Sequence, residues 1–125
     1  MRRRTAWTYR TPWGRTLSAT AGLAALYAGV RLGGPRDRLL WTCAVLPDVA
    51  LLYGAASAPT FDPLPRYAVR PYNVLHSPGV PLVLLGAARA VRSRRPAVAA
   101  CGWLAHIAVD RAWGYGPRAA DGSRL

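Results

Sequence analysis

The chain has 125 residues, enough for one domain and too few for a second hydrophobic core. Its 17 basic residues are all arginine and its five acidic residues are all aspartate, which gives a formal net charge of +12. Soluble helical proteins cover their outer faces with lysine and glutamate, so the lack of both beside 52% hydrophobic residues argues against an ordinary water-soluble bundle. The arginines stand at the ends of apolar stretches, which argues against nucleic acid as the partner.

Stretches of low charge alternate with loops along the chain. The loops are indicated by glycine, proline and arginine at residues 33–35, 59–65 and 92–96. The stretches between them predict helices over residues 16–31, 39–57, 71–90 and 96–115. Arginines and aromatic residues near the helix ends suit the interfaces of a bilayer, although the first and last stretches are shorter than the roughly 20 residues that a span needs. We therefore expect an all-α, four-helix transmembrane bundle with short loops, formed by a single domain over residues 1–125 and embedded in the lipid bilayer.

The N-terminal segment is similar to an export signal, because three arginines after Met1 precede an alanine-rich apolar run. No small-x-small cleavage site follows this run, so we interpret it as a retained first helix. Five arginines before Thr16 favour a cytoplasmic N-terminus, whereas the four arginines within residues 89–95 would then lie outside, against the positive-inside rule. The orientation therefore stays open.

Five polar residues lie inside the apolar stretches: Asp48 in the second, Asn73 and His76 in the third, and His106 and Asp110 in the fourth. His106 and Asp110 stand four positions apart and share one face of a helix. If the last three stretches run as alternating spans, Asp48 and His106 lie about 12–14 Å below one membrane face, and His76 and Asp110 about 7–8 Å below it. Four candidate ligands from three helices therefore fall in one layer.

Two imidazoles and two carboxylates suit a divalent metal ion with nitrogen and oxygen ligands, such as Zn, Mn or Fe. We expect Asp48, His76, His106 and Asp110 to bind this ion, with Asn73 and Arg111 supporting them or contacting a substrate. The alternative is that these groups pair with one another, or Asp110 with Arg111, and stabilise the bundle or relay protons without a metal.

Three motifs of the chain resemble a known family. They are Leu46-Pro-Asp48, Tyr72-Asn73-x-x-His76, and Trp103-Leu-Ala-His106-Ile-x-x-Asp110-Arg111-x-x-Gly114-Tyr-Gly116. Over about residues 17–117 the chain is similar to domain-of-unknown-function family 4260, a family of small bacterial integral membrane proteins. The resemblance implies a four-helix membrane protein without an established activity, and maps its polar motif positions onto Asp48, Asn73, His76, His106, Asp110 and Arg111.

The chain departs from the pattern of this family in two places. Ser77-Pro78 stands where an aromatic residue commonly follows the histidine, and Pro117-Arg118 replaces a Leu-Lys pair. A longer tail with a histidine-containing stretch is missing, so no role of that tail is carried over to this chain.

These observations lead to one hypothesis and two competitors. The hypothesis is an integral protein of the bacterial inner (cytoplasmic) membrane, crossing it several times, whose metal ion activates water against a lipid-derived or small phosphate- or acyl-bearing substrate. The first competitor is a non-enzymatic membrane protein with a structural or proton-relaying cluster. The second is a soluble helical domain that binds DNA. The substrate and the assembly stay open, with a homo-oligomer among the options.

Overall fold

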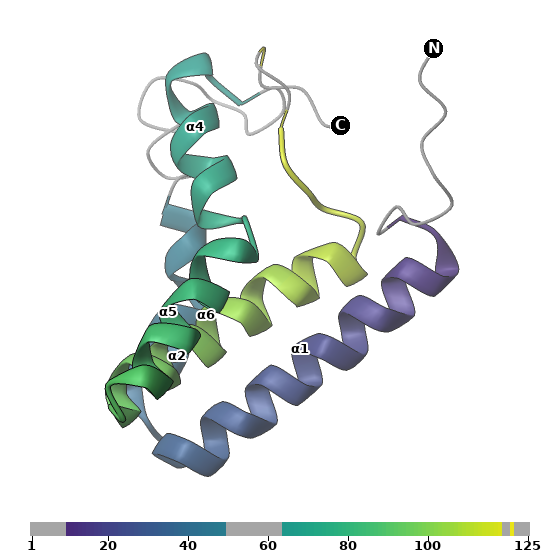
Figure 1. Cartoon of the computed structure of the whole chain (residues 1–125). Helices are drawn as coiled ribbons and strands as arrows, with labels where there is room; N and C mark the ends of the chain where they lie inside the picture. The colour runs from purple at the N-terminus through teal and green to yellow at the C-terminus, as the bar shows by residue number, and fades with distance from the viewer. Residues whose placement is uncertain (1–9, 50–63, 119–120, 122–125) are drawn as a thin grey trace.

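The computed structural model describes residues 10–49, 64–118 and 121, and its regular elements are helices (Figure 1). These helices are α1 (Pro12–Gly33), α2 (Arg38–Val45), the 3-10 helix η1 (Leu46–Asp48), α4 (Arg66–Leu75), α5 (Gly79–Ala90) and α6 (Arg94–Ala112). The all-α class expected from the sequence is therefore confirmed.

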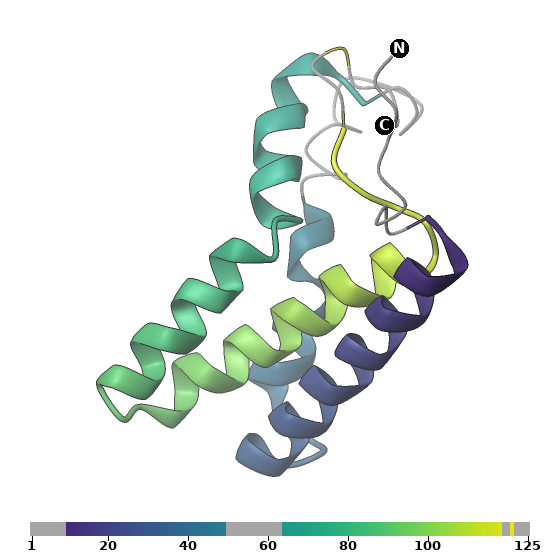
Figure 2. The same cartoon turned by 45° about the vertical axis from the view of Figure 1, so that its right-hand side comes forward.

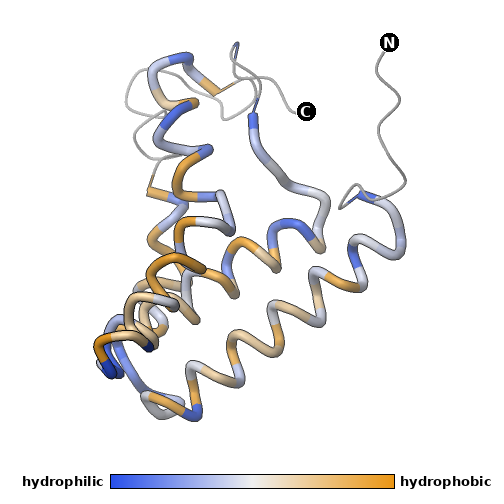
Figure 3. Tube along the Cα trace, in the orientation of Figure 1, coloured by the Kyte–Doolittle hydropathy of each residue, from blue (hydrophilic) through white to orange (hydrophobic). Residues whose placement is uncertain are grey.

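The expected membrane spans have no support in the described residues. Among residues 10–49 and 64–118, no helix is both long enough and apolar enough to cross a bilayer. The two longest helices, α1 and α6, carry hydrophilic residues near both of their ends (Figure 3). The expected span over residues 39–57 extends beyond Val49 and so lies partly outside the described residues.

The sequence predicted one helix over residues 71–90, whereas the structure has two, α4 and α5, joined at His76-Ser77-Pro78. Proline has no backbone N–H and disfavours helical conformation in the residue before it, so a helix ends more easily before Pro78 than it continues. The backbone N–H of His76 makes a last bond of α4, to the carbonyl of Tyr72. Because of this break, α4 and α5 run in different directions (Figures 1 and 2).

Helix α6 is the centre of the fold, because α1, α2 and α5 all pack against it (Figure 2). A Cβ atom at Gly102 would lie 2.3 Å from the carbonyl oxygen of Leu40, so only glycine allows the backbones of α2 and α6 to approach this closely. Leu40, Val98 and Cys101 form the buried core beside this contact. The contact brings the end of α2 against the turn of α6 that follows Gly102.

The starts of α2 and α6 are also joined. Asp37 caps α2, because its Oδ1 accepts hydrogen bonds from the backbone N–H groups of Leu39 and Leu40. The other oxygen of Asp37 accepts a hydrogen bond from Arg95, near the start of α6, at 2.5 Å. The contacts at Gly102 and at Asp37 together fix the position of α2 along the axis of α6.

Candidate metal centre

Asp48, His76, His106 and Asp110 lie together in the structure, although they come from three separate segments. Asp48 is the last residue of η1, His76 follows α4, and His106 and Asp110 lie one turn apart on α6. Each residue offers one ligand atom, and the four atoms lie within 4.8 Å of one another. The Asp/His cluster expected from the sequence is therefore present.

Five of the six distances between the ligand atoms suit a tetrahedral ion. The Nε2 atom of His76 lies 3.3 Å from Asp48 Oδ1 and 3.2 Å from Asp110 Oδ2. The Nε2 atom of His106 lies 3.2 Å from each of these oxygens and 3.2 Å from Nε2 of His76. These five distances are close to the edges of a regular tetrahedron whose centre lies about 2.0 Å from each corner, the usual distance from zinc to nitrogen and oxygen ligands. The sixth distance, between the carboxylates of Asp48 and Asp110, is bounded only by the 4.8 Å within which all four atoms lie.

Backbone contacts decide which ring nitrogen of each histidine faces the centre as an acceptor. Nδ1 of His76 lies 2.8 Å from the carbonyl oxygen of Tyr72, and Nδ1 of His106 lies 2.6 Å from that of Ala44. A carbonyl only accepts hydrogen bonds, so each Nδ1 carries a proton and donates it. In the neutral rings, both Nε2 atoms therefore direct lone pairs at the centre. Metal-binding histidines in proteins are oriented by this kind of bond.

Four acceptor atoms that face one another need positive charge between them. Without a metal, protons on the imidazoles supply it. Burial lowers the pKa of His106, but hydrogen bonds to Asp110 and Asp48 outweigh burial and raise this pKa to about 10. The same opposing causes raise the pKa of His76 above its ordinary value of 6.5.

The carboxyl groups shift in the opposite direction. Hydrogen bonds from His106 and His76 lower the pKa of Asp48. Burial alone would raise the pKa of Asp110, but the hydrogen bonds from both imidazoles outweigh it and lower this pKa as well. Near pH 6 the metal-free cluster thus holds two imidazolium ions and two carboxylates, and it is electrically neutral there.

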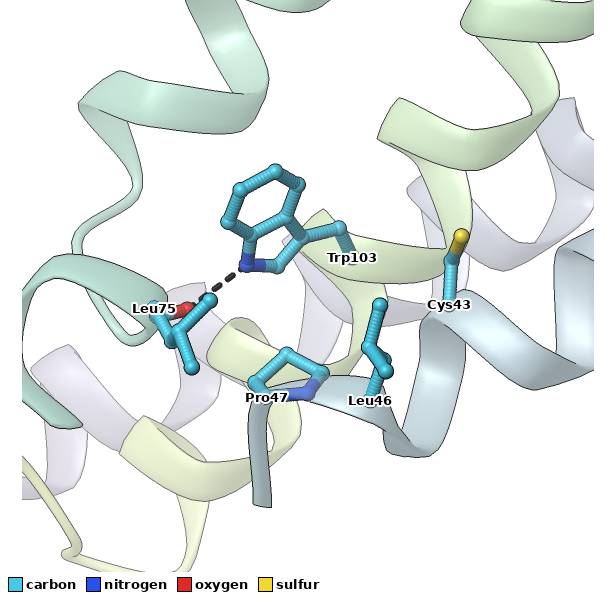
Figure 4. Close-up of a pocket in the computed structure, with 5 residues that line it drawn as sticks. All are labelled: Cys43, Leu46, Pro47, Leu75 and Trp103. Atoms are coloured by element: carbon cyan, nitrogen blue, oxygen red, sulfur yellow. Dashed lines mark hydrogen bonds between the residues drawn. The ribbon is translucent and has the colours of Figure 1, made fainter. Parts of the chain in front are cut away.

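Several contacts hold His76 in place. The ring of Tyr72 stacks on its imidazole with 4.0 Å between the ring centroids. Nη2 of Arg111 donates to the backbone carbonyl of His76 at 2.9 Å. One residue earlier, the indole N–H of Trp103 donates to the carbonyl of Leu75 at 2.6 Å, beside a small apolar pocket (Figure 4). The end of α4 is therefore tied to α6 on both sides of the cluster.

The four residues of the cluster differ in their exposure to solvent. The side chain of Asp48 is 49% exposed, whereas those of His76, His106 and Asp110 are 1%, 8% and 22% exposed. Asp48 is thus the most exposed of the four ligands and His76 the most buried.

Of the two supporting residues expected from the sequence, only Arg111 contacts a cluster residue. Asn73 instead pairs with the backbone of Arg118: its amide donates to the carbonyl at 2.9 Å, and its Oδ1 accepts from the N–H at 2.7 Å. Asn73 therefore anchors the C-terminal segment to α4. The roles of Tyr72 and Trp103 as supports were not expected. Their signals in the sequence are their spacings, four residues before His76 and three before His106, and their places at the start of two family motifs.

The comparisons with known proteins identify a family but no activity. Neither the curated proteins nor the solved structures gave a significant match to the chain. A family model described as a domain of unknown function, DUF4260, matches residues 19–124. The match includes all four residues of the cluster and most of the described helices. The chain therefore belongs to the DUF4260 family.

Proposed function

We propose that the chain binds one divalent metal ion, best matched by zinc, through Asp48, His76, His106 and Asp110. The observation that supports this proposal is the convergence of two Nε2 atoms, each fixed as an acceptor by a carbonyl on Nδ1, with two carboxylates at 3.2–3.3 Å. Zinc favours four nitrogen and oxygen ligands in a tetrahedron, whereas manganese prefers six, mostly oxygen, ligands.

The charge of the cluster favours a divalent ion. Two neutral imidazoles, two carboxylates and one divalent cation sum to zero, as do two imidazolium ions and two carboxylates. A divalent ion therefore replaces two protons without leaving an uncompensated charge beside the buried ring of His76, which would be costly.

The proposed activity is hydrolysis of an ester or phosphoester. A bound zinc ion supplies a Lewis acid and lowers the pKa of a coordinated water to near 7. Catalytic zinc sites keep three protein ligands and one open position, and His76, His106 and Asp110 are the three most enclosed groups here. The half-exposed carboxylate of Asp48 is the ligand able to move aside and to accept a proton from water.

Lipid contact is a further part of the proposal, and location in the bacterial inner membrane stays a prediction. Large apolar side chains are exposed on two helices, including Leu23 and Tyr27 of α1 and Leu82 and Val83 of α5. Such surfaces favour an apolar environment. These apolar surfaces are consistent with a lipid-derived substrate, and a small phosphate- or acyl-bearing substrate is the other option.

Metal content tests the binding proposal. Untagged protein, purified without added metal and then incubated with zinc and desalted at pH 8, is measured by elemental analysis. We expect about one zinc per chain in the wild type and almost none in His106→Ala. Asn73→Ala is the matched control, because it removes two hydrogen bonds outside the cluster, and it should keep its zinc. A wild type that retains no zinc overturns the proposal.

The second candidate is a non-enzymatic protein whose cluster stabilises the fold. It is favoured by the fact that two protons alone satisfy all four groups, at the distances observed. Under this alternative, His106→Ala lowers the melting temperature in chelator and in zinc equally. Under the metal proposal, zinc raises the melting temperature of the wild type and leaves that of His106→Ala unchanged.

A further inference from the structure

Helices α1 and α5 lie on α6 and leave two pockets between them, neither of which is lined by a residue of the cluster. Both pockets are lined by all three helices, and their volumes are about 360 and 450 Å³. The first lies near the C-terminal end of α6 and the second near its start. His106 stands two residues from both Leu104 and Ala108, which line the first pocket, so it points to the other side of α6.

The two pockets follow one another along α6, and we call them together the groove. The lining residues of α6 are spaced three or four positions apart from one pocket into the next: Ala97, Cys101, Leu104, Ala108 and Arg111. Such spacing keeps them on a single face of the helix. From Ala97 to Arg111 this face is roughly 21 Å long, at 1.5 Å per residue. Most of the lining is apolar, so the groove suits a linear hydrocarbon chain.

One end of the groove is strongly basic. Arg89, Arg92 and Arg94 line the second pocket. None of them forms a salt bridge with a carboxylate among residues 10–49, 64–118 and 121, and the one nearby carboxylate, Asp37, is held by Arg95. The first turn of α6 contains no acidic residue. The charge at this end therefore favours an anionic group.

Arg92 occupies a backbone position that normally favours glycine. Its φ is 53°, and it is the only non-glycine residue with a positive φ in the described part of the chain. It follows the last turn of α5, where the N–H of Ser93 bonds back to the carbonyl of Ala88, as in a glycine-terminated helix. An arginine here costs stability that a glycine would not. Despite this cost, the chain carries an arginine here, and Arg92 lines the second pocket.

We propose that this groove binds a single-chain anionic amphiphile, a fatty acid. The acyl chain lies along α6, and the carboxylate meets Arg89, Arg92 and Arg94. The proposal goes beyond the metal-dependent function and does not depend on it, because none of the four cluster residues lines the groove.

The test is calorimetric titration of metal-free, full-length protein with laurate. The comparison ligands are dodecyl maltoside, which has the same chain without a charge, and inorganic phosphate, which is an anion without a chain. We expect laurate to bind more tightly than either. Arg92→Gly should weaken laurate binding about tenfold, since it removes one charged hydrogen-bond donor. The same variant should raise the melting temperature, because glycine fits a positive φ.

A second pair of variants tests the apolar part. Ala25→Phe places a large ring in the groove and should abolish laurate binding, whereas Ala24→Phe, on the exposed outer face of α1, should not. Equal laurate binding in Ala25→Phe and Ala24→Phe overturns the proposal, and so does binding of phosphate alone as tight as that of laurate. The His106→Ala variant should bind laurate like the wild type, so a failed metal site and a failed groove give different results.

Discussion

Zinc binding should release two protons, and this number follows from the two imidazoles of the cluster. In the metal-free protein, the pKa of His106 is raised to about 10 and that of His76 is raised above 6.5, so both rings are protonated near pH 6. The pKa values of Asp48 and Asp110 are lowered from 3.8, so both carboxylates are already ionised there. Only the imidazoles must therefore lose protons before zinc binds.

The magnitude follows from this count. Each released proton contributes a factor of ten in affinity per pH unit, or about 1.4 kcal/mol. Two protons make the zinc affinity rise about 100-fold per pH unit between pH 5 and 6.5. If the imidazoles had the ordinary pKa of 6.5, the zinc affinity would stop rising with pH just above neutral pH. Because the carboxylates raise the pKa of His106 to about 10, a slope of at least one proton, tenfold per pH unit, should continue above pH 7.

Calorimetry in buffers of different ionisation enthalpy counts the protons directly. At pH 6 we expect close to two protons released per zinc bound, with a competing chelator used to bring the affinity into range. In Asp110→Asn, which removes one carboxylate but keeps both imidazoles, the steep dependence should end nearer pH 6.5. A count near zero in the wild type would refute the reasoning, because it would mean that zinc binds elsewhere or that the imidazoles are neutral.

Three further predictions concern stability and affinity. The pKa of His106 is raised in the folded state, so protonated His106 stabilises the metal-free protein below about pH 6.5, and this stabilisation is lost as the pH rises toward 10. Urea denaturation at a series of pH values should show this fall in the free energy of unfolding. A flat profile would contradict the prediction. Gly102→Ala should destabilise the fold by about 1–3 kcal/mol, because the new Cβ would lie 2.3 Å from the carbonyl oxygen of Leu40. The control Gly86→Ala, where no atom lies within 4 Å, should be neutral or stabilising by up to about 1 kcal/mol in the same assay. Trp103→Phe keeps an aromatic ring but removes the indole N–H that ties α4 to α6, so it should lower the free energy of unfolding by about 1 kcal/mol and weaken zinc binding. If neither value changes, Trp103 does not support His76.

The sequence predicted the grouping of the cluster through an argument that the structure supports only in part. The spacing of His106 and Asp110 placed them on one face of a helix, and they are one turn apart on α6. Asp48 and His76 were grouped with them because straight membrane spans that alternate in direction would place all four residues at similar depths below one membrane face. The structure brings the same residues together differently: α4 ends at Leu75, His76 lies at its end, and η1 brings Asp48 to α6.

Asn73 forms its hydrogen bonds outside the cluster for a related physical reason. Its spacing of three residues from His76 places both on one helical face only if the helix continues through both residues. Because α4 stops at Leu75, His76 has φ −103° and ψ 11°, outside the regular helix. Its ring stacks on Tyr72 and faces the cluster, while Asn73 pairs with the backbone of Arg118.

Some features of the site depend on contacts between distant segments, which a single sequence does not encode in a local pattern. The carbonyl of Ala44 that accepts from His106 is 62 positions away in the chain. It reaches the imidazole because α2 crosses α6 closely at Gly102. A glycine in a helix indicates a close approach of some kind, but it does not identify the partner.

The coordination geometry of bound zinc tests the central claim most directly. X-ray absorption at the zinc edge of the protein loaded with one equivalent should show about four nitrogen and oxygen neighbours near 2.0 Å, with outer-shell scattering from two imidazole rings. In His106→Ala, the scattering of one imidazole should disappear. Six oxygen neighbours without imidazole scattering would contradict the account, because zinc would then bind outside the cluster of Asp48, His76, His106 and Asp110.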